Sequence, residues 1–510
     1  MAKNKAIIFG SHPLVENLLS QYRQRDFDVT QQPLSVVGHA EVADVKEIVV
    51  LSEGDDHAAV AQLLSLVHGM DNCGRCGEKL LCHLLLQSAP TLQMMQTCDF
   101  CDAIRRNIDI HPFTMDEEWI RSIVLDYEPI TIQSEKHVHL VIFGMNEIAE
   151  MVAIHAALKA HFPNYVKNHL LRTRITMVDV RAESLCQPFI KRYRNLFDNS
   201  YYRIIKPSEE KAVVRFHKPM YEDCREDFVD VEWEFVEAES WNAELREKLQ
   251  RWAQDEGQLL TIVMADKDQN KNLNEALHLP QELFTRHTHI YIYCHNEISQ
   301  LACPNIHCFG MEDRGYDLTL PLVRMAKNVK YIYDYCYHEN FREQNEQLFY
   351  PVDIDPEQRE RLWAEESSVK RMSSICNAMT IPVKMRSVGL KEDEWEKFYD
   401  IPQHDIEMLA QVEHNRWCVE ELILGYRPCT DEEQEKIADD IGTQKQAFKK
   451  RKIHYDLRAY DDLRPDETGK PAQIYDICLC ACLPLIAKNF VDEDLPSRYS
   501  PARDKEVTNE

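Results

Sequence analysis

The sequence predicts an α/β protein in which two consecutive doubly wound parallel-sheet units precede a small, mainly helical domain. Short apolar runs alternate with helical spacings over roughly the first 320 residues. The alternation stops in a polar stretch near residues 133–136 and then begins again, which indicates a duplicated architecture. After Leu320 the strand pattern fades and helical periodicity remains.

The first unit is expected over residues 1–132. Helical spacings such as Ala58 to Val67 predict its crossover helices. Five apolar runs predict its strands: Lys5–Phe9, Asp26–Thr30, Glu47–Leu51, Lys79–Leu86 and Asn107–Pro112.

The second unit is expected over residues 137–322, with a longer and cleaner pattern. Its helices are predicted at Glu147–His161, Ala238–Ala253 and Leu273–Phe284. Its strands are predicted at His137–Phe143, Ile175–Val180, Val231–Val236, Leu259–Ala265, His289–Cys294 and Asn305–Phe309.

The rest of the chain is predicted to be helical. We expect a linker over residues 323–354, a helical domain over 355–490 and a disordered, polar tail over 491–510. The predicted helices are Met325–Tyr337, Pro356–Ala378, Asp405–Leu424 and Ile474–Phe490.

Composition excludes several classes of protein. The chain has 510 residues, and 59 Lys and Arg against 86 Asp and Glu give a net charge of −27. That balance argues against direct nucleic-acid binding, because phosphate contacts need clustered cations. The N-terminus enters a strand pattern without a signal-peptide core, and the apolar run Ile477–Ala487 is too short to cross a membrane. The sequence therefore predicts a soluble, cytoplasmic protein with no membrane insertion.

A degenerate phosphate-loop pattern opens the second unit. Gly144, Asn146 and Ala149 form G-x-N-x-x-A after the first strand, and Asp179 ends the second, where an acid can bind a ribose hydroxyl. Asn tolerates a left-handed backbone, and Ala is small enough for close helix packing. Against a nucleotide, the Gly144–Asp179 separation is long and Glu147 would repel phosphate. A Rossmann-like site for NAD or another nucleotide and a turn that only builds the fold therefore both remain open.

The first unit has a poorer version of the same pattern. Gly10, His12 and Val15 read G-x-H-x-x-V, with a bulky third residue, and the second strand ends without an acid. We expect this turn to be structural and free of ligand.

The second unit resembles the nucleotide-binding domain of Trk-type potassium-uptake regulators. The resemblance rests on His139–Gly144, Arg174–Asp179 and Ile262–Asp266, and it covers about residues 137–320. It implies regulation by a bound nucleotide, and not hydride transfer.

A second pattern lies on the helix predicted at Asp405–Leu424. Glu413, His414, Trp417, Glu420 and Gly425 read E-H-x-x-W-x-x-E-x-x-x-x-G, and the order His454, Asp456, Leu457, Tyr460, Leu463 and Tyr475 follows. This order resembles the bacterial form of the ryanodine-receptor repeat (RyR) domain. The resemblance implies a helical module that binds or senses a ligand. Glu413, His414, Arg416 and Glu420 are candidates for a ligand groove, and ion pairing on the helix surface is the alternative.

Two cysteine pairs in the first unit have metal-ligand spacing. Cys73, Cys76, Cys98 and Cys101 form C-x₂-C-x₂₁-C-x₂-C, in which four thiolates could close a tetrahedral zinc site. An iron–sulfur or redox pair and plain buried thiols are the alternatives. The 17 cysteines of this long chain are expected to be reduced.

Together these patterns predict a non-catalytic, nucleotide-responsive regulator. Its expected partners are a small nucleotide-type ligand, a membrane transporter or signalling protein, and a second copy of the chain. The alternatives are an NAD(P)-dependent oxidoreductase and a ligand-free scaffold. The sequence contains no G-x-S-x-G, H-E-x-x-H or Walker-type motif that would indicate other chemistry.

Overall fold

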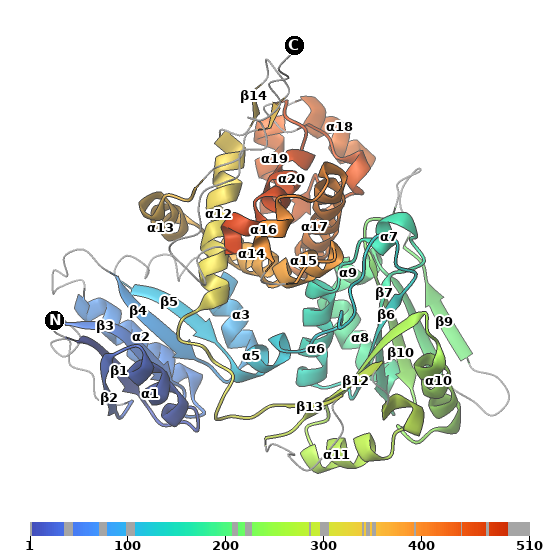
Figure 1. Ribbon diagram of the computed structural model, residues 1–510, viewed down its shortest axis with the longest axis horizontal. Helices are drawn as coiled ribbons and strands as arrows, with labels where there is room; N and C mark the ends of the chain where they lie inside the picture. Colours follow the sequence, from blue (N-terminus) through green and yellow to red (C-terminus); the bar gives the residue numbers. More distant parts are fainter. Residues whose placement is uncertain are drawn as a thin grey trace.

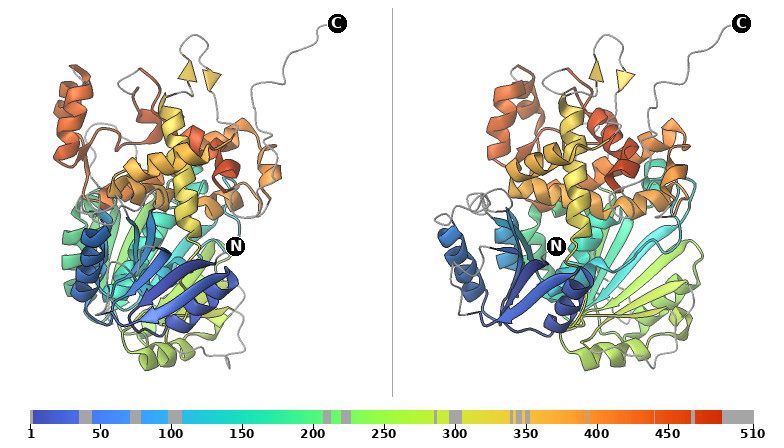
Figure 2. Two further views of the ribbon diagram at one scale, coloured as in Figure 1. Left: turned by 90° about the vertical axis from the view of Figure 1, so that its left-hand side faces the viewer. Right: turned by 60° about the vertical axis from the view of Figure 1, so that its left-hand side comes forward.

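The computed structural model has an α/β architecture with two parallel sheets and a helical region (Figure 1). Figure 2 shows from two further sides that the helical region lies over both sheets. The structure describes residues 3–34, 44–70, 79–97, 108–206, 213–219, 227–284, 287–295, 305–338, 341–342, 347–348, 353–391, 394–439, 441–465 and 469–487.

The first sheet, sheet A, has the strand order β2-β1-β3-β4-β5, and every neighbouring pair is parallel. Its strands confirm all five predicted ones: β1 Asn4–Phe9, β2 Phe27–Gln32, β3 Val45–Leu51, β4 Leu80–Leu85 and β5 Ile108–Phe113. Helices cover both faces. Residues of α1 (Val15–Gln24) and α5 (Met115–Arg121) pack on one face, and residues of α2 (Asp56–Met70) and α3 (Ala89–Thr97) pack on the other.

The second sheet, sheet B, has the order β13-β12-β11-β6-β7-β10-β8-β9 and is parallel except between β8 and β9. The six predicted strands are confirmed. The sequence did not predict β8 and β9, which form a hairpin at one edge. The bounds are β6 His137–Phe143, β7 Thr173–Asp179, β8 Tyr201–Lys206, β9 Val213–His217, β10 Val231–Glu237, β11 Gln258–Met264, β12 Thr288–Tyr293 and β13 Ile306–Phe309.

The helices of the second unit differ from the prediction at two places. The helix predicted from Ala238 begins at Ala243, because Asn242 caps it by accepting from the Leu245 amide. The helix predicted over Leu273–Phe284 is divided near Pro280 into α11 and η2. The bounds are α6 Glu147–Lys159, α7 Asn164–Lys167, α8 Ala182–Arg192, α9 Arg194–Asp198, α10 Ala243–Gln254, α11 Gln269–Leu277 and η2 Gln281–Phe284.

The helical region contains more and shorter helices than predicted. The predicted helix Pro356–Ala378 breaks at Glu366 and Ser367, which have extended backbones, and the predicted helix Ile474–Phe490 breaks at Cys482. The bounds are α12 Pro321–His338, β14 Phe341–Arg342, β15 Gln347–Leu348, α13 Pro356–Glu365, α14 Ser368–Met379, α15 Ile381–Ser387, α16 Trp395–Phe398, α17 Gln403–Ile423, β16 Arg427–Pro428, α18 Asp431–Asp439, α19 Ile441–Lys450, β17 Ile453–His454, η3 Tyr460–Asp462, α20 Gln473–Ala481 and α21 Leu483–Ala487.

One hydrophobic core connects the three parts of the chain. Alternate residues of each sheet point to opposite faces, so Ile8 and Leu140 enter this shared core while Phe9 and Val141 enter separate cores. Val419 and Leu422 of α17 enter the shared core too, and α17 packs against α6 and α9. A displacement of α6 would therefore be felt directly in the helical region.

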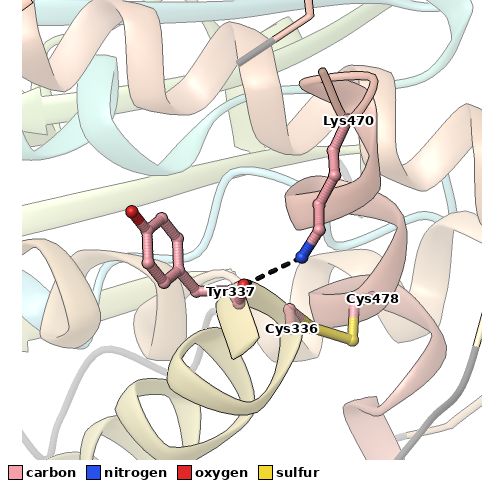
Figure 3. Close-up of a disulfide and its surroundings, with 4 residues drawn as sticks. All are labelled: Cys336, Tyr337, Lys470 and Cys478. Atoms are coloured by element: carbon pink, nitrogen blue, oxygen red, sulfur yellow. Dashed lines mark hydrogen bonds between the residues drawn. A yellow bond between two sulfur atoms is a disulfide. The ribbon is translucent and has the colours of Figure 1, made fainter. Parts of the chain in front are cut away.

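A disulfide corrects the expectation that the cysteines are reduced. Cys336 of α12 and Cys478 of α20 are bonded, across a separation of 142 residues (Figure 3). The Lys470 side chain donates to the Tyr337 carbonyl beside them, at 2.9 Å. Nine other cysteines of the described chain, from Cys82 to Cys482, are not part of a disulfide. No helix among the described residues is long and apolar enough to cross a membrane.

Candidate functional site

The candidate site lies where the strand order of sheet B reverses. From β6 the chain adds strands on the β7 side, and after β10 it returns to the other side of β6 to form β11. The loops after β6 and β11, residues 144–147 and 265–268, therefore lie side by side, and we call them the switch point. In open parallel sheets, ligands bind at such positions, beyond the carboxyl ends of the strands.

Gly144 forms the turn that ends β6. Its φ is +104°, a backbone conformation that residues with a Cβ rarely adopt. A Cβ on Gly144 would also lie 3.4 Å from the carbonyl group of Ala265, at the end of β11. The position therefore favours glycine for its conformation, whereas the contact that a Cβ would make with Ala265 is an ordinary one.

Asn146 caps α6 and joins the two loops. Its Oδ1 accepts from the backbone amides of Ile148 and Ala149, at 2.9 and 3.2 Å, and its Nδ2 donates to the Ala265 carbonyl, at 2.6 Å. Ala149 is fully buried, in keeping with the packing role expected of a small third residue. The Asn146 side chain thus accepts hydrogen bonds from two of the backbone amides at the start of α6.

Three other backbone amides at this turn have no acceptor. Among the described residues, none accepts a hydrogen bond from the amides of Met145, Asn146 or Glu147. The first amides of a helix lack partners inside the helix, and the helix dipole adds positive potential there. The turn can therefore donate hydrogen bonds to an anion.

Asp179 lies at the end of β7, next to β6. One of its carboxylate oxygens accepts from the Arg181 amide, at 2.9 Å, and the side chain is partly exposed. The structure thus brings Gly144, Asn146 and Asp179 to neighbouring strand ends. On the other side of β6, Asn272 of α11 donates to the carbonyls of Asp266 and Tyr293 at 2.7 and 3.0 Å. These hydrogen bonds connect the ends of β11 and β12.

Acidic groups from distant parts of the chain interact electrostatically with the switch point, and no sequence pattern indicated them. Burial, together with the Glu147 and Glu312 carboxylates, raises the pKa of Asp116, in the first turn of α5, to about 6. His295 and Lys267 act in the opposite direction. Lys267 also lies 3.4 Å from Glu147, which is 82% exposed. The charge around the switch point is therefore mixed, with carboxylates in excess.

The corresponding turn of the first unit has similar local chemistry. Gly10 has a φ of +99°, and a Cβ there would lie 2.7 Å from the Leu51 carbonyl oxygen, which is closer than atoms can pack. The His12 ring nitrogen accepts from the Leu14 amide at 3.2 Å, as Asn146 accepts at α6. That this turn is structural and binds no ligand stays a prediction.

The four groove candidates of α17 lie inside the protein. Glu413, His414, Arg416 and Glu420 are each 2% exposed, so ion pairing on the helix surface does not describe them. Arg416 donates to Glu413 at 2.9 Å and to Glu420 at 2.6 Å. His414 Nε2 lies 2.8 Å from the Arg458 carbonyl, to which it can donate. A ligand would have to separate α14 from α17 to reach this network.

The network pairs two carboxylates with two cations. Lys384 lies 2.6 Å from Glu413, so this carboxylate contacts two cations. Burial alone would raise the pKa of Glu413, but Arg416 and Lys384 outweigh it and lower the pKa to about 2. Burial raises the pKa of Glu420 in spite of Arg416, and the Ser373 hydroxyl donates to this carboxylate at 3.1 Å.

The two cysteine pairs, Cys73 with Cys76 and Cys98 with Cys101, lie outside the described residues. Within the described ranges, no three His, Cys, Asp or Glu side chains are arranged to hold a metal ion.

Comparisons of the chain with protein-family models, curated proteins and solved structures found no match. The resemblances to potassium-uptake regulators and to the ryanodine-receptor repeat therefore stay predictions that rest on the residues quoted for them.

Proposed function

We propose that this protein is a cytoplasmic, nucleotide-responsive regulator whose second unit is Rossmann-like and binds a nucleotide-type ligand at the switch point. The open amides of residues 145–147 would receive a phosphate, and Asp179 would accept from a ribose hydroxyl. The observation that carries the proposal is the Gly144 turn, which has a φ of +104° and presents these amides at the point where the strand order reverses.

The local charge restricts the class of ligand that the switch point is expected to bind. Asp116, Glu147 and Glu312 would repel a highly charged phosphate chain at neutral pH. Ligands that carry one or two phosphate charges, such as NAD⁺ or ADP-ribose, are therefore expected to bind more tightly than ATP. Because the pKa of Asp116 is about 6, binding of an anion should strengthen as the pH falls through 6 and this carboxyl takes up a proton.

A regulatory role is favoured by the packing of α6. The helix begins at the switch point, and α17 of the helical region packs against it. A ligand that moves the start of α6 would shift the surface on which α17 lies. The RyR-like module would respond to that shift or to a ligand of its own. A membrane transporter or signalling protein would then bind the module differently in the two states.

Calorimetric titration of the full chain tests the site. The panel is NAD⁺, NADH, ADP-ribose, ATP and a cyclic nucleotide. Asn146→Gly frees the amides of Ile148 and Ala149, and glycine still permits the helix start. The substitution also removes the hydrogen bond to the Ala265 carbonyl, so the expected affinity is the net of both changes. We expect this variant to bind the preferred ligand about tenfold more tightly, as one additional charge-assisted hydrogen bond would give.

Asn242→Gly is the matched control, because Asn242 caps α10 through the same kind of hydrogen bond away from the switch point. It should leave affinity unchanged. Absence of binding to any member of the panel would contradict the proposal and favour a ligand-free scaffold. Turnover of the nicotinamide cofactor with a substrate would favour an NAD(P)-dependent oxidoreductase.

We also retain the proposal of a structural zinc ion at Cys73, Cys76, Cys98 and Cys101. Its support is the spacing of the two pairs. Metal analysis of purified protein should find about one equivalent of zinc, and substitution of all four residues with Ser should abolish it. Less than a few tenths of an equivalent in the unsubstituted protein would refute the zinc site.

A further inference from the structure

A cavity of about 170 Å³ lies between sheet A and the helical region, away from the switch point. Residues of β5 and α5 form one wall, and residues of α12, α13 and α14 form the opposite wall. The segment from Tyr316 to Val323, which leads out of the second unit into α12, forms a third side. The cavity is therefore lined by the first unit, by the helical region and by the segment that joins the second unit to α12.

Its wall is mainly apolar and contains the rings of a Phe, a Tyr and a Trp, beside the His111 imidazole. The rings of Phe113 and Tyr316 are stacked, with centroids 3.6 Å apart, and Trp363 of α13 also lines the space. Ile375 of α14 and Val323 of α12 contribute aliphatic surface. An apolar cavity of about 150 Å³ holds benzene, so this space has the volume of a one- or two-ring molecule.

Each charged side chain on the wall has an ion-pair or hydrogen-bond partner. His111 lies 3.1 Å from Asp109, and the exposed Asp317 accepts from the Thr319 amide and hydroxyl at 2.8 and 2.7 Å. Arg121 lies between the carboxylates of Glu117 and Glu118. Arg371 donates to the carbonyls of Ala364 and Glu366, each at 3.1 Å, and its guanidinium lies 5.0 Å from the Trp363 ring centroid. A charged ligand would have to lose its hydration without gaining an unengaged counter-charge, which is costly in a low-dielectric space.

We propose that this cavity is a second ligand site and that it takes a small, neutral aromatic or heteroaromatic molecule. Volume and rings set the size and shape of the ligand, and the paired charges exclude an ion. Because Tyr316 and Val323 belong to the segment that joins the second unit to α12, occupancy would fix the position of this segment against sheet A. The proposal does not depend on nucleotide binding at the switch point.

Titration of the full chain with three probes tests the chemistry of the site. Indole is the neutral probe, and benzoate and benzylamine are charged probes of similar size. Binding is followed by calorimetry and by saturation-transfer NMR of the probe. We expect saturable binding of indole and affinities at least about tenfold weaker for both charged probes.

Two substitutions, one on α14 and one on α12, would fill the cavity. Ile375→Trp and Val323→Phe both add side-chain volume to its wall, and each should weaken indole binding at least about tenfold. Lys370→Trp is the control, because this residue lies on α14 but is 72% exposed and is not part of the wall. It should leave binding unchanged. Circular dichroism and thermal unfolding confirm that each variant is folded.

Three results would overturn the proposal. They are no saturable binding of indole by the unsubstituted chain, equal binding of either charged probe, and undiminished binding in a folded cavity-filled variant. The third result would show that indole binds elsewhere on the surface.

Discussion

Arg416→Met would remove the guanidinium that joins two buried carboxylates of α17. Arg416 contacts Glu413 at 2.9 Å and Glu420 at 2.6 Å, and all three side chains are buried. Loss of one partner from a buried ion pair costs about 3–5 kcal/mol. Glu413 keeps Lys384 at 2.6 Å, whereas Glu420 keeps the Ser373 hydroxyl. One carboxylate thus loses its cation, and we expect a loss near the lower end, about 3 kcal/mol.

The direction of the pH dependence follows from Glu420. Its pKa is already raised in the folded protein, and removal of Arg416 would raise it further. A carboxyl whose folded pKa is raised stays protonated while the unfolded chain ionises, so stability falls as the pH rises. The cost of Arg416→Met should therefore be larger at pH 8 than at pH 5.

Urea unfolding, followed by circular dichroism and tryptophan fluorescence, measures this cost. Arg194→Met is the matched control, because Arg194 and Asp198 also form an i, i+4 pair but are 78% and 57% exposed. That control should lose less than about 0.5 kcal/mol. Adding Glu420→Gln to Arg416→Met should recover most of the loss, because no unpaired carboxylate remains. Equal losses in the two single variants, or no recovery in the double variant, would refute the reasoning.

Three further perturbations test other parts of the structure. Burial and the Glu420 carboxylate raise the pKa of Glu421 to about 8, so stability is lost as the pH rises from 4.5 to 8. Glu421→Gln should therefore be neutral near pH 4.5 and stabilising by about 2–4 kcal/mol at pH 8 in urea unfolding, and the exposed Glu407→Gln on the same helix should change neither value. Dithiothreitol should lower the melting temperature of the unsubstituted protein but not that of Cys478→Ser, because the bond closes a long loop and contributes up to about 5 kcal/mol; equal shifts would contradict this. Gly10→Ala should destabilise the protein by about 1–2 kcal/mol more than Gly54→Ala, because both have positive φ but a Cβ at Gly54 meets no atom within 4 Å; equal thermal shifts would refute the steric argument.

The sequence predicted the central, buried strands and missed the hairpin of β8 and β9 at the edge of sheet B. β6 is buried along its whole length and reads as a continuous apolar run. In β9, by contrast, Val213 and Phe216 are exposed, and the strand lies at the edge of sheet B without a buried face to give it periodicity. The break between α13 and α14 was missed because helical spacing continues across Glu366 and Ser367.

The candidate site was predictable where its residues stand at the ends of predicted strands, and this includes Asp179, which is distant from Gly144 in sequence. Gly144 and Asn146 follow a strand directly, and the pattern of a turn before a helix indicated them. Asp116 and Glu312 reach the same place from other parts of the fold, and no local pattern connects them. The burial of Arg416 was not predictable either, because it depends on the packing of α14 and α6 against α17.

Hydrogen–deuterium exchange of the full chain, with and without the nucleotide that the calorimetric panel selects, tests the central claim most directly. A ligand phosphate at the start of α6 would protect amides that have no acceptor in the described chain. We predict slower exchange in peptides that cover residues 144–149 and 265–268, and no change in those that cover β1 and the Gly10 turn. Slower exchange that is confined to other peptides, or none under saturating ligand, would contradict the assignment of the nucleotide to the switch point.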